Sequence, residues 1–183
     1  MRAVPTDLDG LLVFETEPHR DDRGFFTRTG DVEVLAAAGI DRTGFKQDSQ
    51  SRSFGGVVRG MHGRSGSGEA KLVRCAHGAI MDVVIDARPH SATFGQVRSF
   101  RLDDDEHRQL YIPRGFLHGF ESLSPVSDVC YRIDAFYTPG DDITVRFDDP
   151  ELAIEWQASA PMVSDRDRAG ASWNDYARSV GRS

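Results

Sequence analysis

The chain has 183 residues, a formal net charge of −7 at pH 7 and a pI near 5.3. This length fits one domain with a sizeable core, and the acidic balance argues against nucleic acid as a main partner. The N-terminus lacks the regions of a signal peptide and no apolar run is long enough to span a membrane, so we expect a cytoplasmic protein with no membrane partner.

The first third of the chain predicts short strands and one short helix. A strand is predicted at 11–14, a turn at 21–24 and a helix over 31–39, with an aspartate at its N-cap position and a glycine at its end. The stretch 45–53 is polar and serine-rich. Two glycines then lead into an apolar run that ends at His62, where we expect the next strand.

Short apolar runs separated by turns follow at 72–75, 79–85, 97–102, 109–112, 117–123 and 129–136. We expect the first two of these strands to pair around a turn at His77-Gly78. After Pro139 the sequence indicates irregular coil, followed by a final helix over 171–180. Many short strands at this spacing are typical of a sandwich or barrel, so the predicted fold class is all-β, with short peripheral helices.

The domain organisation is simple. The sequence shows no linker, no internal repeat and no composition shift that would mark a second unit. We therefore expect a single domain over 1–183, with a barrel core at about 45–140 and a C-terminal coil after it.

Strand alternation indicates which side chains share a face. Tyr131 and Tyr137 are expected to point the same way, and His118 shares a face with Phe120. Lys71 is expected to point into the barrel, where an ammonium without a partner is costly to bury. Either a functional anion or carbonyl meets Lys71, or this residue lies solvated at the barrel mouth.

His62 is the candidate catalytic base. It ends the stretch Arg59-Gly60-Met61-His62. A histidine suits general-base catalysis because its unperturbed pKa lies near neutrality. A lone histidine is more often a structural core residue, so the hypothesis depends on the residues around it.

The stretch 113–119 has the pattern Pro-x-Gly-x-x-His-Gly and resembles the second motif of the cupin superfamily, in which the histidine faces the barrel cavity. Metal-binding cupins also carry a His-x-His pair and a glutamate in a first motif. Only His62 and the nearby Glu69 are present here, so we expect no metal. Cys75 and Cys130 have no metal or redox spacing; we expect free thiols, and the sequence leaves a disulfide open.

Motifs along nearly the whole chain together resemble one metal-free cupin family, the dTDP-4-dehydrorhamnose 3,5-epimerases. Each motif alone is weak, and their common order carries the resemblance. The matching pieces lie at 22–26, 47–48, 51–53, 58–62, 71–74, 82–88, 93–95, 109–113, 115–120, 131, 137–139, 148–150, 154–156 and 164–167. The resemblance implies a cupin jelly-roll barrel (a double-stranded β-helix) and a homodimer that shares strands between subunits.

The resemblance also implies the chemistry, namely proton removal next to the C4 ketone of a nucleotide-diphosphate keto sugar and proton return on the other face. His62 matches the base, and Asp167, in the C-terminal coil, matches the aspartate that hydrogen-bonds it. Tyr131 matches the acid on the opposite face, and Lys71 matches the residue near the ketone. No cofactor and no metal are implied.

Substrate contacts are implied at further positions. Arg59 and His118 match residues that line the family's cavity, and the positions that hold the nucleotide or its diphosphate are matched by Arg23, Phe26, Gln47 and Tyr137. An arginine suits this task because its fork of N–H donors fits phosphate oxygens, even in a chain that is acidic as a whole.

The sequence departs from the family pattern mainly where sugar and nucleotide would bind, at Arg28, Ser49, Gln50, Gly63, Arg64, Tyr111 and Arg114. The base, the aspartate, the tyrosine and the lysine are all present, so we expect the chemistry to survive. The exact nucleotide and the carbon or carbons epimerised stay open. A loop of small residues at 63–68 suggests the hypothesis that the pocket has room for a bulkier or differently placed sugar.

Several alternatives stay open. The substrate can be a GDP-linked, CDP-linked or heptose keto sugar in place of a dTDP-linked hexose. A related cupin ketoisomerase also needs a histidine base, but we expect a different acid from Tyr131. A non-catalytic sugar-binding cupin does not require the full set of base, carboxylate, acid and lysine. A metal-dependent cupin oxygenase is disfavoured by the incomplete ligand set.

Overall fold

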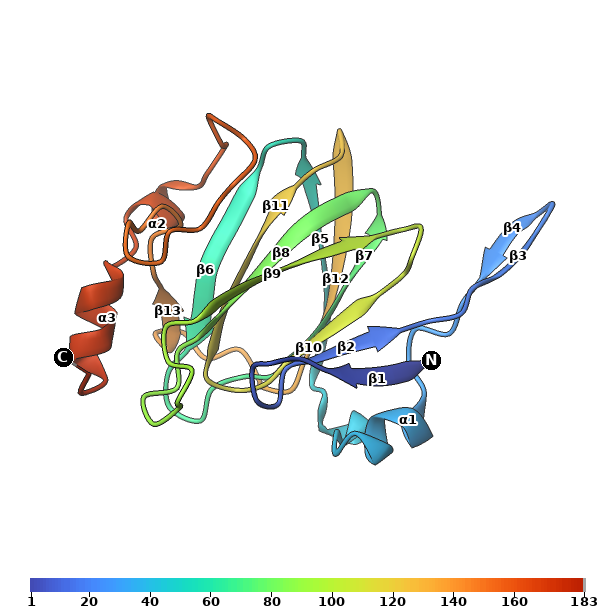
Figure 1. Cartoon of the computed structure of the whole chain (residues 1–183), viewed down its shortest axis with the longest axis horizontal. Helices are drawn as coiled ribbons and strands as arrows, with labels where there is room; N and C mark the ends of the chain where they lie inside the picture. Colours follow the sequence, from blue (N-terminus) through green and yellow to red (C-terminus); the bar gives the residue numbers. More distant parts are fainter. Residues whose placement is uncertain (183) are drawn as a thin grey trace.

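Two antiparallel sheets face each other in the computed structural model, which describes residues 1–182 (Figure 1). The first sheet has the order β1 (Arg2–Pro5), β2 (Leu12–Glu15), β10 (Gln109–Ile112), β7 (Lys71–His77), β12 (Val126–Ile133) and β5 (Gln47–Phe54). The second has the order β13 (Asp142–Thr144), β6 (Val58–Arg64), β11 (Phe116–Ser122), β8 (Ala79–Asp86) and β9 (Val97–Asp103). The predicted all-β class is confirmed.

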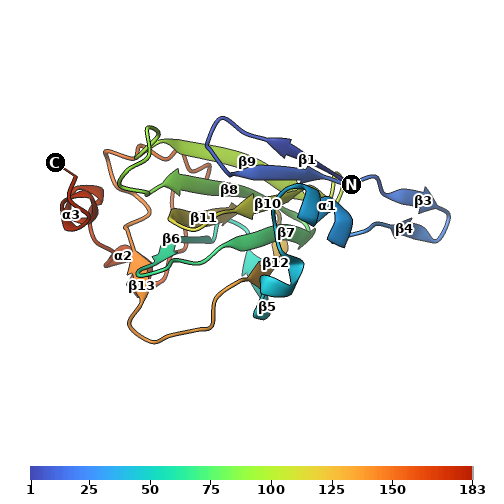
Figure 2. The same ribbon diagram turned by 90° about the horizontal axis from the view of Figure 1, so that it is seen from below.

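A separate two-stranded hairpin, β3 (His19–Asp21) and β4 (Gly24–Phe26), contains the predicted turn at 21–24. In both views it projects from one end of the molecule, and the C-terminal helix lies at the other end (Figures 1 and 2). Hydrogen bonds attach the start of the hairpin to the barrel. Arg20 donates to the carbonyl of Asp105, and Thr16 donates to the carbonyl of His107.

Strands β7 and β8 are consecutive in the chain but lie in opposite sheets. The predicted pairing around His77-Gly78 is therefore wrong: β7 pairs with β10 and β12, whereas β8 pairs with β9 and β11. Gly78 permits the crossing because its φ is 75° and a Cβ there would lie 2.3 Å from the Val126 carbonyl oxygen. Apolar periodicity on either side of a glycine does not distinguish such a crossing from a hairpin.

The polar stretch at 45–53 mostly belongs to strand β5 (Gln47–Phe54), which the sequence did not identify as a strand. β5 pairs with β12 along its whole length, from Gln47 opposite Ile133 to Phe54 opposite Val126. It is the last strand of its sheet. An edge strand does not need the apolar alternation of a central strand, which explains why its composition concealed it.

The sheets also extend beyond the expected barrel core at 45–140. β1 and β2 join the first sheet next to β10, and β13 joins the second next to β6. Side chains from both sheets fill the space between them, and the main cluster includes Val73, Ile80, Val84, Leu102, Leu110, Ile112, Phe120 and Val129. Burial of this apolar surface stabilises the facing sheets.

The helices are short and peripheral. α1 (Val32–Ala37) has the predicted cap, since the Asp31 carboxylate accepts from the backbone N–H groups of Glu33 and Val34. α3 (Trp173–Ser179) lies within the predicted 171–180. Between them, a short 3₁₀ turn η1 (Arg42–Gly44) precedes β5, and α2 (Asp165–Arg168) forms one turn where coil was predicted. No helix within residues 1–182 is long and apolar enough to cross a membrane.

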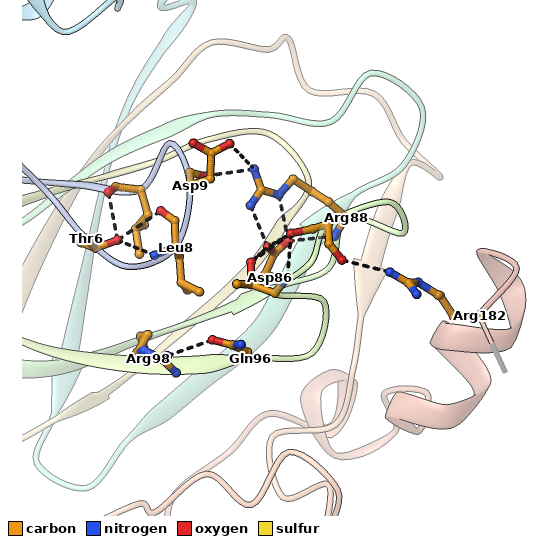
Figure 3. Close-up of polar contacts among 11 residues, drawn as sticks. Thr6, Leu8, Asp9, Asp86, Arg88, Gln96, Arg98 and Arg182 are labelled. Carbon is orange, nitrogen blue, oxygen red and sulfur yellow. Dashed lines mark hydrogen bonds and ion pairs between the residues drawn. The ribbon is translucent and has the colours of Figure 1, made fainter.

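Asp86 holds the loop at the end of β8. Its carboxylate, which is completely buried, accepts from Arg88 Nε at 2.8 Å and Nη2 at 2.7 Å, and from the hydroxyls of Ser91 and Thr93 at 2.6 Å each. Arg88 also donates to the carbonyl of Asp9 at 3.0 Å (Figure 3). Burial alone raises the pKa of Asp86, but these donors outweigh it and lower that pKa to about 2.

We expect Asp86→Asn to lower the free energy of unfolding by about 2 kcal/mol at pH 7, because the depressed pKa of Asp86 stabilises the folded state. This contribution is present above the unfolded-state pKa of about 4 and is lost as pH falls through about 2. The gap between wild type and variant should therefore shrink towards acid. Urea unfolding at pH 7 and pH 3 measures it, and a gap that stays constant contradicts this account.

Candidate active site

One pocket of about 330 Å³ lies between the two sheets. Seven of the ten predicted site residues line it: His62, Lys71, Tyr131, Gln47, Arg59, His118 and Tyr137. Its other lining residues are Ser49, Ser51, Arg64, Glu69, Gly119, Phe120 and Ile133. Both sheets thus contribute polar side chains to one concave site, which is the usual setting of an active site.

His62 bonds Asp167 from the C-terminal part of the chain. A hydrogen bond of 2.6 Å joins His62 Nε2 to Asp167 Oδ1, and the Gly60 backbone N–H donates to Asp167 Oδ2 at 3.2 Å. Asp167 is 3% exposed. When Nε2 carries the proton towards the carboxylate, Nδ1 of the imidazole is left to accept another proton.

The position of Asp167 is set by α2, not by a coil as predicted. The Ser164 side chain caps this turn by accepting from the Asp167 backbone N–H at 3.1 Å. Burial raises the pKa of the Asp167 carboxyl, but His62, the Gly60 N–H and Ser164 stabilise its charged form and hold that pKa below its ordinary value. The carboxylate is therefore charged at neutral pH.

A close approach of strands β6 and β11 sets the spacing of the two pocket histidines. His62 on β6 is the register partner of His118 on β11, with a register shift beyond His118. Gly60 has a φ of 135°, and a Cβ there would lie 2.6 Å from the Cα of Gly119. Only glycine accommodates both the conformation and the contact.

Tyr131 approaches the pocket from the first sheet. Its hydroxyl lies 3.0 Å from Ser51 Oγ, and its ring meets His118 edge-on with centroids 6.4 Å apart. Burial raises the pKa of Tyr131 well above its ordinary value, and the hydrogen bond with Ser51 only partly offsets this. The phenol is therefore neutral at pH 7 and has a proton to donate.

Lys71 has a partner that the sequence did not indicate. Its ammonium lies 2.9 Å from Glu69 Oε1, and Arg64 Nε donates to Glu69 Oε2 at 2.9 Å. The Lys71 side chain is 11% exposed, so it is neither solvated at the barrel mouth nor buried without a counter-charge. Glu69, considered from the sequence only as a candidate metal ligand, is the counter-charge.

His118 also has a carboxylate partner that sequence reasoning missed. Its Nε2 lies 2.8 Å from Oδ2 of Asp82, which is completely buried on β8. Asp82 fell within a matched motif but had no assigned role. The alternation of β8 could have identified it, since Asp82 stands between apolar residues that fill the core.

Arg23 and Phe26 do not reach the pocket of their own chain. Both belong to the projecting β3–β4 hairpin, where Phe26 is 71% exposed and the Arg23 guanidinium donates to Asp21 at 2.5 Å. One chain alone does not bring these two residues to its pocket, and their substrate contacts stay a prediction. An exposed ion pair of this kind contributes little to stability.

A second hollow, of about 520 Å³, adjoins the first at His62 and Arg59. Besides Arg59 it is lined by the side chains of Arg52 and Arg166, neither of which was predicted as a site residue. Arg166 directly precedes Asp167 in the sequence, and this position could have indicated that Arg166 lies near the site. Guanidinium groups suit phosphate oxygens, but Arg52 bonds Asp128 at 2.7 Å and Arg166 bonds Asp142 at 3.1 Å, so a bound anion has to compete with these carboxylates.

Apart from Arg64, the small-residue loop does not line this pocket, and the hypothesis of a bulkier or differently placed sugar stays a prediction. Residues 65–68 line a separate hollow near α3, and only Arg64 of the departing loop faces the first pocket. A Cβ at Gly63 would lie 2.7 Å from Leu117 Cδ2, so Leu117 already fills this space.

Comparisons with known proteins identify the family. Residues 5–175 match the family described as dTDP-4-dehydrorhamnose 3,5-epimerase. A relative of that name from Pseudomonas aeruginosa is 37% identical over 176 residues, which cover 96% of this chain and 97% of the relative. The chain belongs to the dTDP-4-dehydrorhamnose 3,5-epimerase family.

Solved structures of the family superpose closely on this one. NovW of Streptomyces spheroides, described as a 4-keto-6-deoxy sugar epimerase, gives a TM-score of 0.93 at 36% identity and covers 99% of this chain and 91% of its own. ChmJ of Streptomyces bikiniensis, a 3'-monoepimerase in complex with dTDP-quinovose, gives 0.89 at 30% identity, with coverages of 99% and 91%. The predicted cupin jelly roll and the predicted isomerase class are confirmed.

We expect Gly60→Ala to lower the free energy of unfolding by about 2 kcal/mol or more, because the added Cβ meets the Gly119 backbone at a disfavoured φ. Urea unfolding measures this loss. Gly44→Ala is the matched control, since a Cβ at Gly44 meets nothing within 4 Å and its φ is ordinary. Equal stabilities of the two variants would contradict the constraint assigned to the β6–β11 contact.

Proposed function

We propose that this epimerase acts on a dTDP-linked 4-keto-6-deoxy sugar at C3, at C5 or at both, in deoxysugar biosynthesis and without a cofactor. The observation that carries the proposal is the meeting of the His62–Asp167 pair and a neutral Tyr131 at one pocket. Proton transfer at a carbon needs a base on one face and an acid on the other.

In the proposed reaction His62 removes the proton from the carbon next to the C4 ketone. The electron pair of that C–H bond forms the enolate, and the negative charge moves to the ketone oxygen. Lys71 stabilises this oxygen by its positive charge. Tyr131 then donates its proton to the opposite face of the carbon. The proton on His62 passes to solvent, and the tyrosinate takes a proton back from solvent, so the protons balance.

Asp167 acts on the base. Its carboxylate fixes the orientation of the His62 ring and stabilises the imidazolium that forms when the proton arrives. Because Asp167 is buried and also accepts from the Gly60 N–H, it cannot turn freely towards the substrate. This supports a positioning role for Asp167 and a direct role for His62.

The arginine-lined hollow is the proposed binding site for the nucleotide end of the substrate. Arg59 borders both hollows, which places a cationic surface beside the base. We propose that the diphosphate lies there, with Arg52 and Arg166, and that the sugar occupies the smaller pocket with His118, Gln47 and Tyr137. The dTDP form is proposed because a family relative, ChmJ, is described in complex with dTDP-quinovose.

We further propose a cytoplasmic homodimer. The hairpin that carries Arg23 and Phe26 projects from one end of the molecule and exposes Phe26, which suits a contact with a second copy (Figure 1). Sedimentation of the purified protein tests this, and a species with the mass of one chain, 20.3 kDa, would contradict it.

Solvent deuterium incorporation tests the reaction. In heavy water with dTDP-4-keto-6-deoxyglucose, wild type should introduce one or two deuterons at C3 or C5, and the count distinguishes mono-epimerisation from double epimerisation. His62→Asn should abolish incorporation, because no base is left. A shift of the ketone from C4 to C3 would favour the ketoisomerase alternative. Binding without any exchange would leave a sugar-binding protein.

Tyr131→Phe should separate exchange from inversion. The variant keeps His62, which can remove a proton and return a deuteron to the same face, so deuterium incorporation from solvent should persist. Inverted product should fall by about 10²-fold or more, since the acid on the other face is missing. NMR of the product sugar reports both quantities, and a variant that inverts at the wild-type rate would exclude Tyr131 as the acid.

A further inference from the structure

Three charged side chains, those of Lys71, Glu69 and Arg64, contact one another in series along one wall of the pocket. Lys71 Nζ lies 2.9 Å from Glu69 Oε1, and the other oxygen of Glu69 accepts from Arg64 Nε at 2.9 Å. The side chains of Lys71, Glu69 and Arg64 are 11%, 9% and 9% exposed. All three line the pocket that contains His62.

Arg64 continues the contacts into the 137–142 segment. Its guanidinium donates to the Thr138 carbonyl at 3.3 Å, lies 3.5 Å from Asp142 Oδ1, and has its Cζ 5.5 Å from the centre of the Tyr137 ring. Arg64 therefore connects Glu69 to a segment whose Tyr137 also borders the pocket. A cation over an aromatic ring adds to this contact.

The alternating charges of Lys71, Glu69 and Arg64 determine the net charge beside the pocket. Glu69 alone would neutralise Lys71 and cancel its effect on a nearby oxygen. Arg64 gives Glu69 a second positive partner, so the three groups together keep one net positive charge beside the pocket. Burial raises the pKa of Glu69, but Lys71 and Arg64 more than compensate and lower it below its ordinary value, so this residue is charged at neutral pH.

We infer that Glu69 and Arg64 are positioning residues that hold the Lys71 ammonium at the oxygen where charge develops in the reaction. Glu69 fixes one donor direction of a side chain that otherwise turns about four bonds, and Arg64 fixes Glu69. A donor held in place before the reaction stabilises a developing oxyanion without reorganisation. This inference rests on the proposed epimerase function and assigns roles to two residues outside the base–acid set.

Lys71 and Lys46 are the only lysines of the chain, and this permits a test that needs no substrate. Lys46 is exposed and serves as an internal reference. Reductive methylation with formaldehyde, followed by peptide mass spectrometry, gives the labelling rate of each lysine. In wild type we expect Lys71 to react about tenfold or more slowly than Lys46, because an ammonium bonded to a buried carboxylate is protected.

Glu69→Gln should raise the Lys71-to-Lys46 labelling ratio about fivefold or more, since the carboxylate is lost while the side-chain shape is kept. Because Glu69→Gln leaves Arg64 without its carboxylate, the double variant Arg64→Gln/Glu69→Gln provides a second form without that imbalance, and it should show the same rise. Arg101→Gln is the control, since Arg101 pairs with Asp103 on β9 outside the pocket and should leave the ratio unchanged. A ratio unchanged in both Glu69 variants would overturn the inference.

Kinetics supply the second readout. With a dTDP-4-keto sugar, Glu69→Gln and the double variant should lower kcat by about ten- to a hundredfold while KM changes by less than about threefold, because the contact acts on the transition state. Wild-type kcat in Glu69→Gln would overturn the positioning role. Absence of turnover in wild type would instead overturn the proposed function, and the labelling ratio would still decide whether Glu69 holds Lys71.

Discussion

The close approach of β6 and β11 is the constraint on which the site depends. At Gly60 and Gly119 the two backbones leave no room for a side chain, and the register shifts at this contact, between the pair Arg59–Phe120 and the facing pair His62–His118. The same Gly60 gives its N–H to Asp167, so the tight strand contact also positions the carboxylate that bonds His62. Backbone packing, rather than the reacting groups themselves, thus fixes the distance between β6, β11 and the C-terminal turn.

The pocket is rich in ionisable groups, and each has a specific partner. His62 bonds Asp167, His118 bonds Asp82, Lys71 bonds Glu69 and Tyr131 bonds Ser51. Such pairing reduces the cost of placing charges in a partly buried space. It also fixes the directions of these side chains.

The sequence predicted features whose cause is local. The Asp31 cap, the turn at 21–24, the last helix and the run of short strands all follow from a few adjacent residues. The family resemblance supplied His62 and Asp167, which no local pattern would connect. Strand pairing over long range was not predicted correctly. The apolar runs beside Gly78 fit a hairpin or a crossing between sheets equally well, and only the packing of both sheets decides between them. The roles of Glu69 and Asp82 as partners of Lys71 and His118 were missed, because tertiary structure decides which side chain a carboxylate meets.

Asp167 lies 105 residues after His62, beyond the last strand, on a single helical turn capped by Ser164. The named strands are complete at Thr144, so the barrel strands and the carboxylate that orients His62 are encoded in separate parts of the gene. During synthesis every strand leaves the ribosome before that carboxylate does. A premature stop between these two points yields a chain that has all its strands and yet lacks the partner of His62.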